Sequence, residues 1–308
     1  ELGRDPLWDP LGHMIDRAHA AGLQVHAYVN VYPTWSGSLA PPTNTVPHHP
    51  FWTWSWWPDT GWADWRHWDD SEQAMKLNDG YLYASPGAPP VTDHIVELVA
   101  DIAARYEIDG MHLDYIRYAG PQYSCDPFSI DRFPGDACFG AGWEDWQRAQ
   151  VTELVRRAHQ AMPSGVKLSA AVWPIYQDRW GWEAREGREF YYQDSQGWIQ
   201  AGIIDILFPM IYPANYSADY WTQYRFETLI NDFQDHAAGR YIVAGIGGGY
   251  DDFGEIAARI AIARAAIPPG QTGGHAIFSY GLLESKGHWE SFVSPGGPHT
   301  DPALPFRP

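Results

Sequence analysis

The chain has 308 residues, of which 45% are hydrophobic and 19% are charged. This composition supports a large buried core and excludes wholesale disorder. The formal net charge of −18 argues against DNA, RNA or an anionic membrane as a partner, because such partners attract a basic surface. No apolar run approaches the roughly 20 residues of a membrane span. The opening residues, ELGRDPLWDP, do not have the pattern of a signal peptide.

Apolar strand-like runs alternate with amphipathic helical stretches along the chain. The first 22 residues contain a predicted helix, in which Leu11, Met14, Ile15 and Ala18 recur at helical spacing. The next expected elements are a strand at 23–33, a Trp- and Pro-rich segment at 34–80, a short strand at 81–87, a helix at 91–107 with Thr92 or Asp93 near its cap, and a strand at 108–119.

The same alternation continues to the end of the chain. The expected elements are a helix at 143–162, a strand at 166–176, a helix ending near Gly202, a strand at 203–213, a helix at 219–238, a strand at 240–250, a helix at 252–267 and a strand at 274–284. Such a pattern predicts a parallel sheet covered by helices. The seven strands indicate a (β/α)8 TIM-type barrel that lacks its first strand in this chain. We expect a single domain over 1–308, with a Trp-rich insertion at 34–80 and an irregular tail at 294–308.

Aromatic residues are unusually frequent, with 17 Trp and 18 Tyr, and eight of the Trp lie between residues 35 and 68. Aromatic rings offer flat apolar faces with polar edges, which suit sugar rings. The cluster therefore predicts a surface that stacks on a carbohydrate. The alternative is a loop that uses large side chains as a small core of its own.

The two cysteines, Cys125 and Cys138, lie 13 residues apart in a Pro-, Gly- and Asp-rich stretch. This spacing does not match a CxxC metal motif. We expect a disulfide, which would place the protein in an oxidising compartment, extracellular or periplasmic. The alternative is a pair of free thiols in the cytosol.

Polar residues follow one face of the predicted strand at 108–119. Met111 and Leu113 share one parity, whereas His112 and Asp114 share the other. In a barrel the polar parity points to the axis, and catalytic groups lie at the carboxyl ends of the strands. Because an inward Asp is costly unless it is paired or functional, Asp114 is the first candidate for catalysis.

The strand at 23–33 repeats this pattern, with His26, Tyr28 and Asn30 on its polar face. Two polar rows favour a polar site at one mouth of the barrel. His26 by itself is equally compatible with a hydrogen-bonded structural role. Asp109 and Asp205, at the starts of their strands, are expected to be structural.

The motif DGMHLDYIRYA resembles the signature DGIHLDYIRYP of the glycosyl hydrolase-like 10 family of bacterial proteins. Further blocks of similarity, DPLGHMIDRAHAAGLQVHAYVNVY, YQDSQGWIQAGIIDILFPMIY and HAIFSY, extend the resemblance over most of 5–285. Departures are Ala119 in place of Pro, Ser195 in place of Trp, and the enlarged Trp-rich segment. The resemblance implies a (β/α)8 barrel that acts on a bacterial polysaccharide and whose first strand is absent from this chain.

Glycoside hydrolysis generally uses two carboxyl groups that flank the bond. By analogy with related barrels, Asp114 serves as nucleophile or acid. Its partner is expected from the carboxyl end of another strand, with Glu284 first, then Asp194 and Asp178; Asp251 and Asp252 are further options. Each of these carboxylates could equally be a surface or capping residue.

Further polar and aromatic residues are expected to contact the sugar, although each could equally serve the core or an ion pair. The predicted substrate-binding residues are His26, Tyr28, Asn30, His112, Arg117, Tyr118, Trp173, Tyr212 and Tyr280.

Other reaction classes lack their motifs. The His48–His49 pair lies in a Pro-rich loop, no HExxH metal motif occurs, and GxSxG is absent. The segment GIGGGY at 245–250 lacks the Lys-Ser/Thr of a phosphate-binding loop. We therefore expect a secreted glycosidase without metal or cofactor, acting on a polysaccharide by two-carboxylate chemistry. The alternative is a non-catalytic glycan-binding barrel.

Overall fold

The computed structural model describes residues 5, 7–54, 65–77, 80–214, 216 and 220–299. The chain divides into two compact units. The first comprises Glu1–Leu168 and Arg185–Asp194, and the second Ser169–Ala184 and Ser195–Pro308. The expectation of a single domain stays a prediction.

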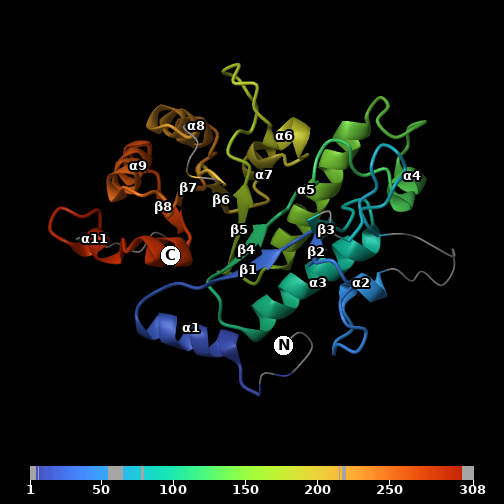
Figure 1. Cartoon of the computed structure of the whole chain (residues 1–308), viewed down its shortest axis with the longest axis horizontal. Coiled ribbons are helices and arrows are strands. Elements are labelled where there is room, and N and C mark those ends of the chain that lie inside the picture. Colours follow the sequence, from blue (N-terminus) through green and yellow to red (C-terminus); the bar gives the residue numbers. More distant parts are fainter. Residues whose placement is uncertain are drawn as a thin grey trace. The chain divides into compact units, whose positions relative to one another are not determined.

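The first unit combines a parallel strand pair with helices and a small antiparallel strand pair (Figure 1). Strands β1 (His26–Asn30) and β4 (Gly110–Asp114) pair in parallel, and β2 (Pro33–Ser36) and β3 (Tyr81–Tyr83) pair antiparallel. The helices of this unit are α1 (Pro10–Ala20), α2 (Pro50–Thr53), α3 (Pro89–Arg105), α4 (Pro127–Arg132), α5 (Trp143–Ala161) and α6 (Gly187–Phe190). The long helices α3 and α5 pack against each other.

The second unit holds the later strands, which are parallel. Its strands are β5 (Lys167–Val172, whose first two residues belong to the first unit), β6 (Ile206–Pro209), β7 (Tyr241–Gly247) and β8 (Gly273–Phe278). Its helices are α7 (Ser195–Gln200), α8 (Gln223–Asp235), α9 (Phe253–Ala265), α10 (Tyr280–Lys286) and α11 (Trp289–Val293). Helices α8 and α9 pack together, and α9 also contacts β7 and β8.

The strand order β1-β4-β5-β6-β7-β8 confirms the expected α/β class, and the described strands have the arrangement of a (β/α)8-type barrel. Two strand predictions were wrong. The strand expected at 81–87 is β3, which pairs with β2 outside the parallel sheet, so the described residues contribute six parallel strands rather than seven. The last strand ends at Phe278 instead of 284, because Ser279 and the residues after it begin helix α10.

Local sequence signals explain where several helices begin. The Asp9 carboxylate caps α1 by accepting the Gly12 N–H, and the Thr222 hydroxyl caps α8 by accepting the Arg225 N–H. The cap expected at Thr92 or Asp93 was wrong, since α3 begins at Pro89 and Ala88 is its N-cap residue. Proline suits that first position because its missing N–H has no intrahelical partner there.

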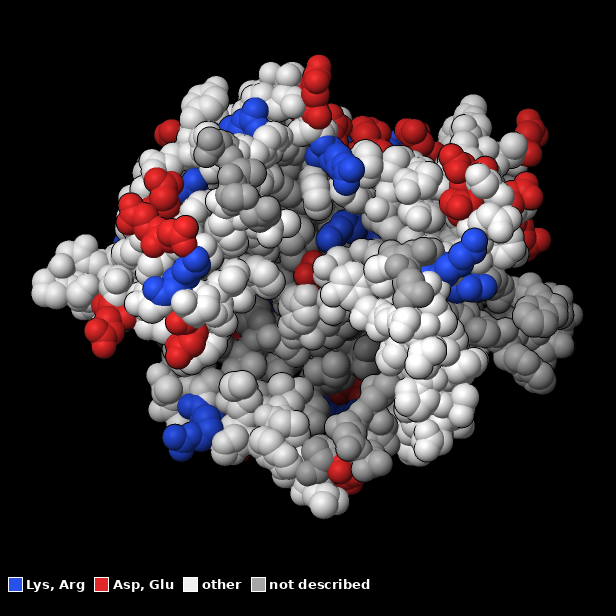
Figure 2. Space-filling model, viewed as in Figure 1, with Lys and Arg blue, Asp and Glu red and all other residues white. Residues whose placement is uncertain are grey.

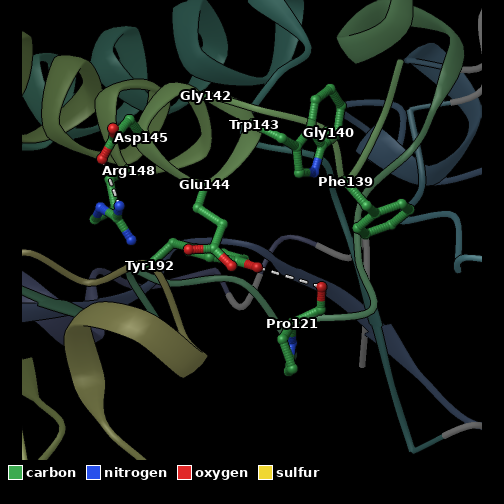
Figure 3. A pocket seen from close by; sticks show the side chains of 9 residues that line it. All are labelled: Pro121, Phe139, Gly140, Gly142, Trp143, Glu144, Asp145, Arg148 and Tyr192. Atoms are coloured by element: carbon green, nitrogen blue, oxygen red, sulfur yellow. Dashed lines mark hydrogen bonds and ion pairs between the residues drawn. The ribbon is translucent and has the colours of Figure 1, made fainter.

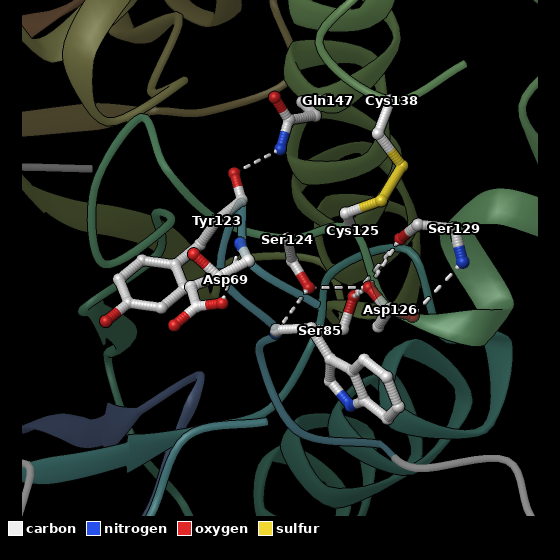
Figure 4. Close-up of a disulfide and its surroundings, with 11 residues drawn as sticks. Asp69, Ser85, Tyr123, Ser124, Cys125, Asp126, Ser129, Cys138 and Gln147 are labelled. Atoms are coloured by element: carbon white, nitrogen blue, oxygen red, sulfur yellow. Dashed lines mark hydrogen bonds between the residues drawn. A yellow bond between two sulfur atoms is a disulfide. The ribbon is translucent and has the colours of Figure 1, made fainter. Parts of the chain in front are cut away.

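A disulfide joins Cys125 and Cys138, whose Cα atoms lie 5.8 Å apart, as the sequence predicted (Figure 4). Next to it, the buried carboxylate of Asp126 accepts hydrogen bonds from the hydroxyl groups of Ser85, Ser124 and Ser129, each at 2.6 Å. These contacts tie the segment after β4 to helix α4 and to Ser85, two residues after β3.

The Trp-rich segment forms part of its own core where it is described. Trp65 is only 1% exposed and makes edge contacts with Phe51 and Trp54. The indole N–H groups of Trp35 and Trp52 donate to the carbonyls of Leu39 and Pro41. These four tryptophans therefore help to fold the segment; Trp56, Trp57 and Trp62 lie outside the described residues.

Acidic side chains are spread over the face drawn in Figure 2, in keeping with the net charge of −18. Within the described residues, no helix combines the length and apolar character needed to cross a membrane.

Candidate active site

The register of β1 and β4 places the two predicted polar rows side by side. The facing pairs are His26 with Gly110, Tyr28 with His112, and Asn30 with Asp114. A side chain at Gly110 would place its Cβ 2.3 Å from Nδ1 of His26, so the ring of His26 fills the space that glycine leaves open. Both rows end at the carboxyl edge of their strands, where barrel enzymes carry their chemistry.

Asp114 lies at the centre of this arrangement and is only 9% exposed. The hydroxyl of Tyr28 lies 2.6 Å from Oδ2 of Asp114 and 2.8 Å from Oδ1 of Asn30, so its single proton serves one acceptor at a time. The backbone N–H of Tyr115 donates to Oδ1 of Asp114 at 2.6 Å. Both carboxylate oxygens are thus engaged by donors.

A buried cation completes the surroundings of Asp114. The Nη1 of Arg117 lies 3.6 Å from Oδ1 of Asp114, and the guanidinium sits over the ring of Tyr115, 4.5 Å from its centroid. Tyr115 has φ = 51°, a left-handed conformation that is uncommon for a bulky residue and is typical of functional sites. This turn directly after β4 lets the N–H of Tyr115 reach the carboxylate while its ring supports Arg117.

His112 is a neutral group at physiological pH. Burial lowers its pKa to about 4, although the charge of Asp114 opposes that shift. Its ring stacks on Tyr28 at 5.8 Å between centroids, while Tyr28 itself is 54% exposed. An exposed aromatic ring next to a held carboxylate can present a flat face to a sugar at the place where the carboxylate acts.

Four further tyrosines surround this centre and were missed by the sequence reasoning. The rings of Tyr81 and Tyr83 contact Tyr115 edge-on, and the guanidinium of Arg117 lies 5.9 Å from the centroid of Tyr191. Burial raises the pKa of Tyr83, which keeps its hydroxyl protonated. The sequence gives one signal for them, which is that tyrosines are frequent in the motifs YLY, DYIRY and YYQD. The sequence does not show which of these rings contact one another, because that depends on the fold.

A cavity of about 250 Å³ in the first unit lies at the start of α5 (Figure 3). The hydroxyl of Tyr192 donates to the carbonyl of Pro121 at 3.3 Å across one side of it, and Glu144 extends toward this pair. The neighbour of Tyr192 in the chain is Tyr191, which contacts Arg117. Consecutive residues of one segment therefore contribute to both places, Tyr191 to the surroundings of Arg117 and Tyr192 to the cavity.

The other predicted residues of the first unit have contacts of their own. Tyr118 is fully buried and stacks on His67 at 5.2 Å, facing the interior. Oδ1 of Asp194 lies 4.0 Å from Nε of Arg188. Asp109 accepts the N–H of Val25 at 2.7 Å and lies 3.0 Å from the His19 ring, contacts that suit the structural role expected of it.

The remaining predicted residues belong to the second unit. Asp178 accepts the backbone N–H groups of Trp180, Trp182 and Ala184. Partial burial alone would raise its pKa, but these donors outweigh burial and lower that pKa. Glu284 was expected to follow the last strand; it lies instead on the exposed side of α10.

The aromatic candidates of the second unit follow the ends of its strands. Trp173 is half-buried directly after β5. Tyr212, after β6, stacks in parallel on Phe278 at the end of β8, with 5.4 Å between centroids. Tyr280 is the first residue of α10 and lies against Trp289. Phe278 was not singled out by the sequence.

No group of three or more His, Cys, Asp or Glu side chains in the described part of the chain could hold a metal ion. The arrangement around Asp114 offers a carboxylate, a neutral imidazole, tyrosine hydroxyls and a guanidinium. These groups suit acid–base chemistry on a hydroxyl-rich substrate.

The sequence profile of the glycosyl hydrolase-like 10 family matches residues 1–228. The glycosyl hydrolase DigH of Escherichia coli K12 is 28% identical over 229 residues, which cover 69% of this chain and 48% of that protein. The glycosyl hydrolase YngK of Bacillus subtilis 168 is 27% identical over 230 residues, which cover 68% of this chain and 40% of that protein. The chain thus spans less than half the length of these curated relatives.

Two solved structures share the fold. The glycoside hydrolase domain of PgaB (BpsB) from Bordetella bronchiseptica superposes with a TM-score of 0.61 at 11% identity, covering 94% of this chain and 79% of that one. The α-L-fucosidase isoenzyme 2 of Paenibacillus thiaminolyticus superposes with a TM-score of 0.55 at 14% identity, covering 93% and 40%. The likeness confirms the barrel architecture.

Proposed function

Because this chain belongs to the glycosyl hydrolase-like 10 family, we propose that it hydrolyses glycosidic bonds in a polysaccharide, with Asp114 as one of its two catalytic carboxyl groups. The observation that carries the proposal is the setting of Asp114 at the carboxyl end of β4. Donors engage both of its oxygens, and the exposed ring of Tyr28 lies next to it.

The contacts of Asp114 favour a carboxylate that attacks or accepts a proton over an acid that donates one. Tyr28 and Tyr115 donate to its two oxygens, and Arg117 adds a positive charge nearby. In the proposed reaction Asp114 attacks the anomeric carbon or activates a water molecule, while a second carboxylic acid protonates the glycosidic oxygen.

The candidates for the second carboxyl group are Asp194, Asp178 and Glu284. Asp194 is the candidate that shares the first unit with Asp114. Asp178 is already engaged by three backbone N–H groups, and Glu284 is exposed on α10. These contacts favour Asp194 as the first of the three to test.

The neighbours of Asp114 would hold the sugar. The ring of Tyr28 offers a stacking face, and Asn30, neutral His112 and Arg117 offer hydrogen-bonding groups. We propose a bacterial cell-wall polysaccharide or exopolysaccharide as the substrate, supported by the family membership. The Cys125–Cys138 disulfide supports an extracellular or periplasmic location.

The test is the release of reducing ends from a panel of bacterial and plant polysaccharides by the wild type, Asp114→Asn and Asp109→Asn. Asp109 precedes β4 at its opposite end and serves as the matched control. We expect Asp114→Asn to lower turnover about 1,000-fold or more and Asp109→Asn to change it only a few-fold.

Equal turnover by the wild type and Asp114→Asn would remove Asp114 from the mechanism. Binding of a glycan without turnover by the wild type would instead favour a non-catalytic glycan-binding barrel, the alternative function.

A further inference from the structure

The glycine-rich segment GIGGGY at 245–250, which forms the end of β7 and the turn after it, has a role that its sequence did not indicate. A Cβ on Gly247 would lie 2.3 Å from the hydroxyl oxygen of Tyr216, and a Cβ on Gly249 would lie 2.5 Å from the ring of Tyr216. The absence of side chains at these two positions therefore lets the ring of Tyr216 lie against the backbone. The segment thus provides a flat surface against which the side chain of Tyr216 packs.

That ring forms one wall of a cavity of about 700 Å³ in the second unit. The cavity lies where β6 and β7 lead into α8 and α9. It is lined by Tyr216, Trp221, Thr222, Gln223, Tyr224, Tyr250, Glu255 and Arg259. Its volume falls within the range of about 300–1,000 Å³ that small-molecule sites occupy. The carboxyl ends of parallel strands are the common place for ligands in such folds.

The wall is held in place by an edge-on aromatic contact and a cation–π contact. Tyr216 meets Tyr250 edge-on at 5.0 Å, and the guanidinium of Arg259 lies 4.4 Å from the centroid of Tyr250. Arg259 is 2% exposed and donates to the carbonyl of Trp221 at 2.6 Å. A rigid aromatic wall binds a ligand without losing much side-chain freedom.

The polar groups of the cavity are arranged without net charge. Glu255 pairs with Arg259 at 2.5 Å, and the amide of Gln223 lies 3.3 Å from both oxygens of Glu255. The hydroxyl oxygen of Tyr250 and Nε of Arg259 are buried without a hydrogen-bond partner in the described part of the chain. Aromatic faces combined with a neutral set of donors and acceptors fit a polyhydroxylated ring.

We propose that this cavity is a binding site for neutral sugar rings. Trp221 and Tyr224 supply stacking faces, Gln223 and Glu255 supply hydrogen bonds, and the Glu255–Arg259 pair disfavours anionic sugars. The inference goes beyond the proposed function, because binding here does not require Asp114.

The test is calorimetric titration of the full chain carrying Asp114→Asn, so that no turnover interferes. The probes are three neutral trisaccharides (triacetylchitotriose, cellotriose and maltotriose) and acidic trigalacturonate. We expect at least one neutral trisaccharide to bind. We expect Trp221→Ala and Tyr224→Ala each to weaken that binding about tenfold, and trigalacturonate to bind more weakly.

Two comparisons make the outcome decisive. Tyr224 is 69% exposed, so its removal tests the site even if Trp221→Ala fails to fold. Trp289→Ala removes a half-exposed ring of α11 outside the cavity and is expected to leave affinity unchanged. Glu255→Gln leaves Arg259 without its carboxylate partner and is expected to raise the affinity for trigalacturonate.

The proposal is overturned if no neutral trisaccharide binds, if Tyr224→Ala binds as tightly as the parent, or if trigalacturonate is the preferred ligand of the parent. Loss of binding in the cavity variants supports the proposed sugar site, whether or not the wild type hydrolyses a polysaccharide. A wild type without hydrolytic activity would count only against the proposed function.

Discussion

Two aspartates of the first unit, Asp114 and Asp126, are both buried and both hydrogen-bonded, yet their surroundings differ. Asp114 is engaged by Tyr28, Tyr115 and Arg117, and one of these partners is largely exposed. Asp126 is fully buried and is enclosed by the hydroxyl groups of three serines beside the disulfide.

The difference between these two sets of partners indicates which surroundings leave a carboxylate accessible for reaction. The neutral hydroxyl groups around Asp126 saturate it, and burial raises its pKa while Ser124, Ser129 and Ser85 offset part of that rise. The partners of Asp114 include a cation and an exposed tyrosine, so a sugar can approach beside the carboxylate. We therefore expect Asp126 to serve stability and Asp114 to serve turnover.

The largest effect on stability is expected from Asp126→Ala. The change leaves three hydroxyl groups and the Ser129 N–H without their acceptor in a buried place. We expect the free energy of unfolding to fall by about 3–5 kcal/mol, measured by urea denaturation. Asp114→Asn, which keeps the side-chain shape, is the control and should unfold close to the wild type. If both variants lost a similar free energy of unfolding, the contrast between a stabilising Asp126 and a catalytic Asp114 would not hold.

Removal of the disulfide is expected to have the next largest effect. The Cys125–Cys138 bond closes a loop with a sequence separation of 13 residues, and its loss should lower the free energy of unfolding by about 3 kcal/mol. The measurement is denaturation of Cys125→Ser/Cys138→Ser beside the wild type with and without reductant. The double variant has no disulfide, so reductant should not change its free energy of unfolding. A change would show that reductant acts on the protein in some way other than by breaking this bond.

Buried histidines should make stability depend on pH. Burial lowers the pKa of His67 to about 3, and neither of its ring nitrogens is hydrogen-bonded to a described residue. The unfolded chain takes up a proton at this histidine below about pH 6.5, whereas the folded chain does not until about pH 3. Stability therefore falls as the pH drops through this window, by about 2 kcal/mol between pH 7 and pH 5 for this residue.

His67→Phe tests this dependence, because phenylalanine keeps the stack with Tyr83, Tyr118 and Tyr123 but does not titrate. Denaturation at pH 7 and pH 5 should show a smaller loss in the variant. An unchanged loss would assign the pH dependence to other groups, such as His112 and His275, whose pKa values burial also lowers to about 4.

The smallest effect is expected from Tyr28→Phe, which sharpens the contrast at Asp114. The ring remains as a stacking face, but the hydroxyl that donates to Asp114 is lost. We expect kcat to fall about tenfold and KM to change little. Tyr106→Phe removes a hydroxyl that contacts Asp9 and is the control. A rise in KM with unchanged kcat would show that the hydroxyl binds substrate instead of positioning Asp114.

Periodicity was enough to predict the long helices. The helices expected at 91–107 and 143–162 are α3 and α5, because their buried residues recur at helical spacing whatever they pack against. The strand expected at 274–284 was too long, because the mostly apolar run HAIFSYGLLE continues past Phe278, where the strand ends. An apolar run of this kind does not show where a strand gives way to a helix.

The sequence by itself determined the β/α alternation, the disulfide pair and the parity that sets His112 and Asp114 on one face, because these follow from local spacing. Only the tertiary structure decided that Tyr28 and Asn30 meet Asp114, and that Tyr216 rests on Gly247 and Gly249. The physical reason is that the first contact depends on the register between two strands, and the second on the close approach of a ring to a distant stretch of backbone. Both depend on residues far apart in the chain, so no local pattern encodes which side chains share a site.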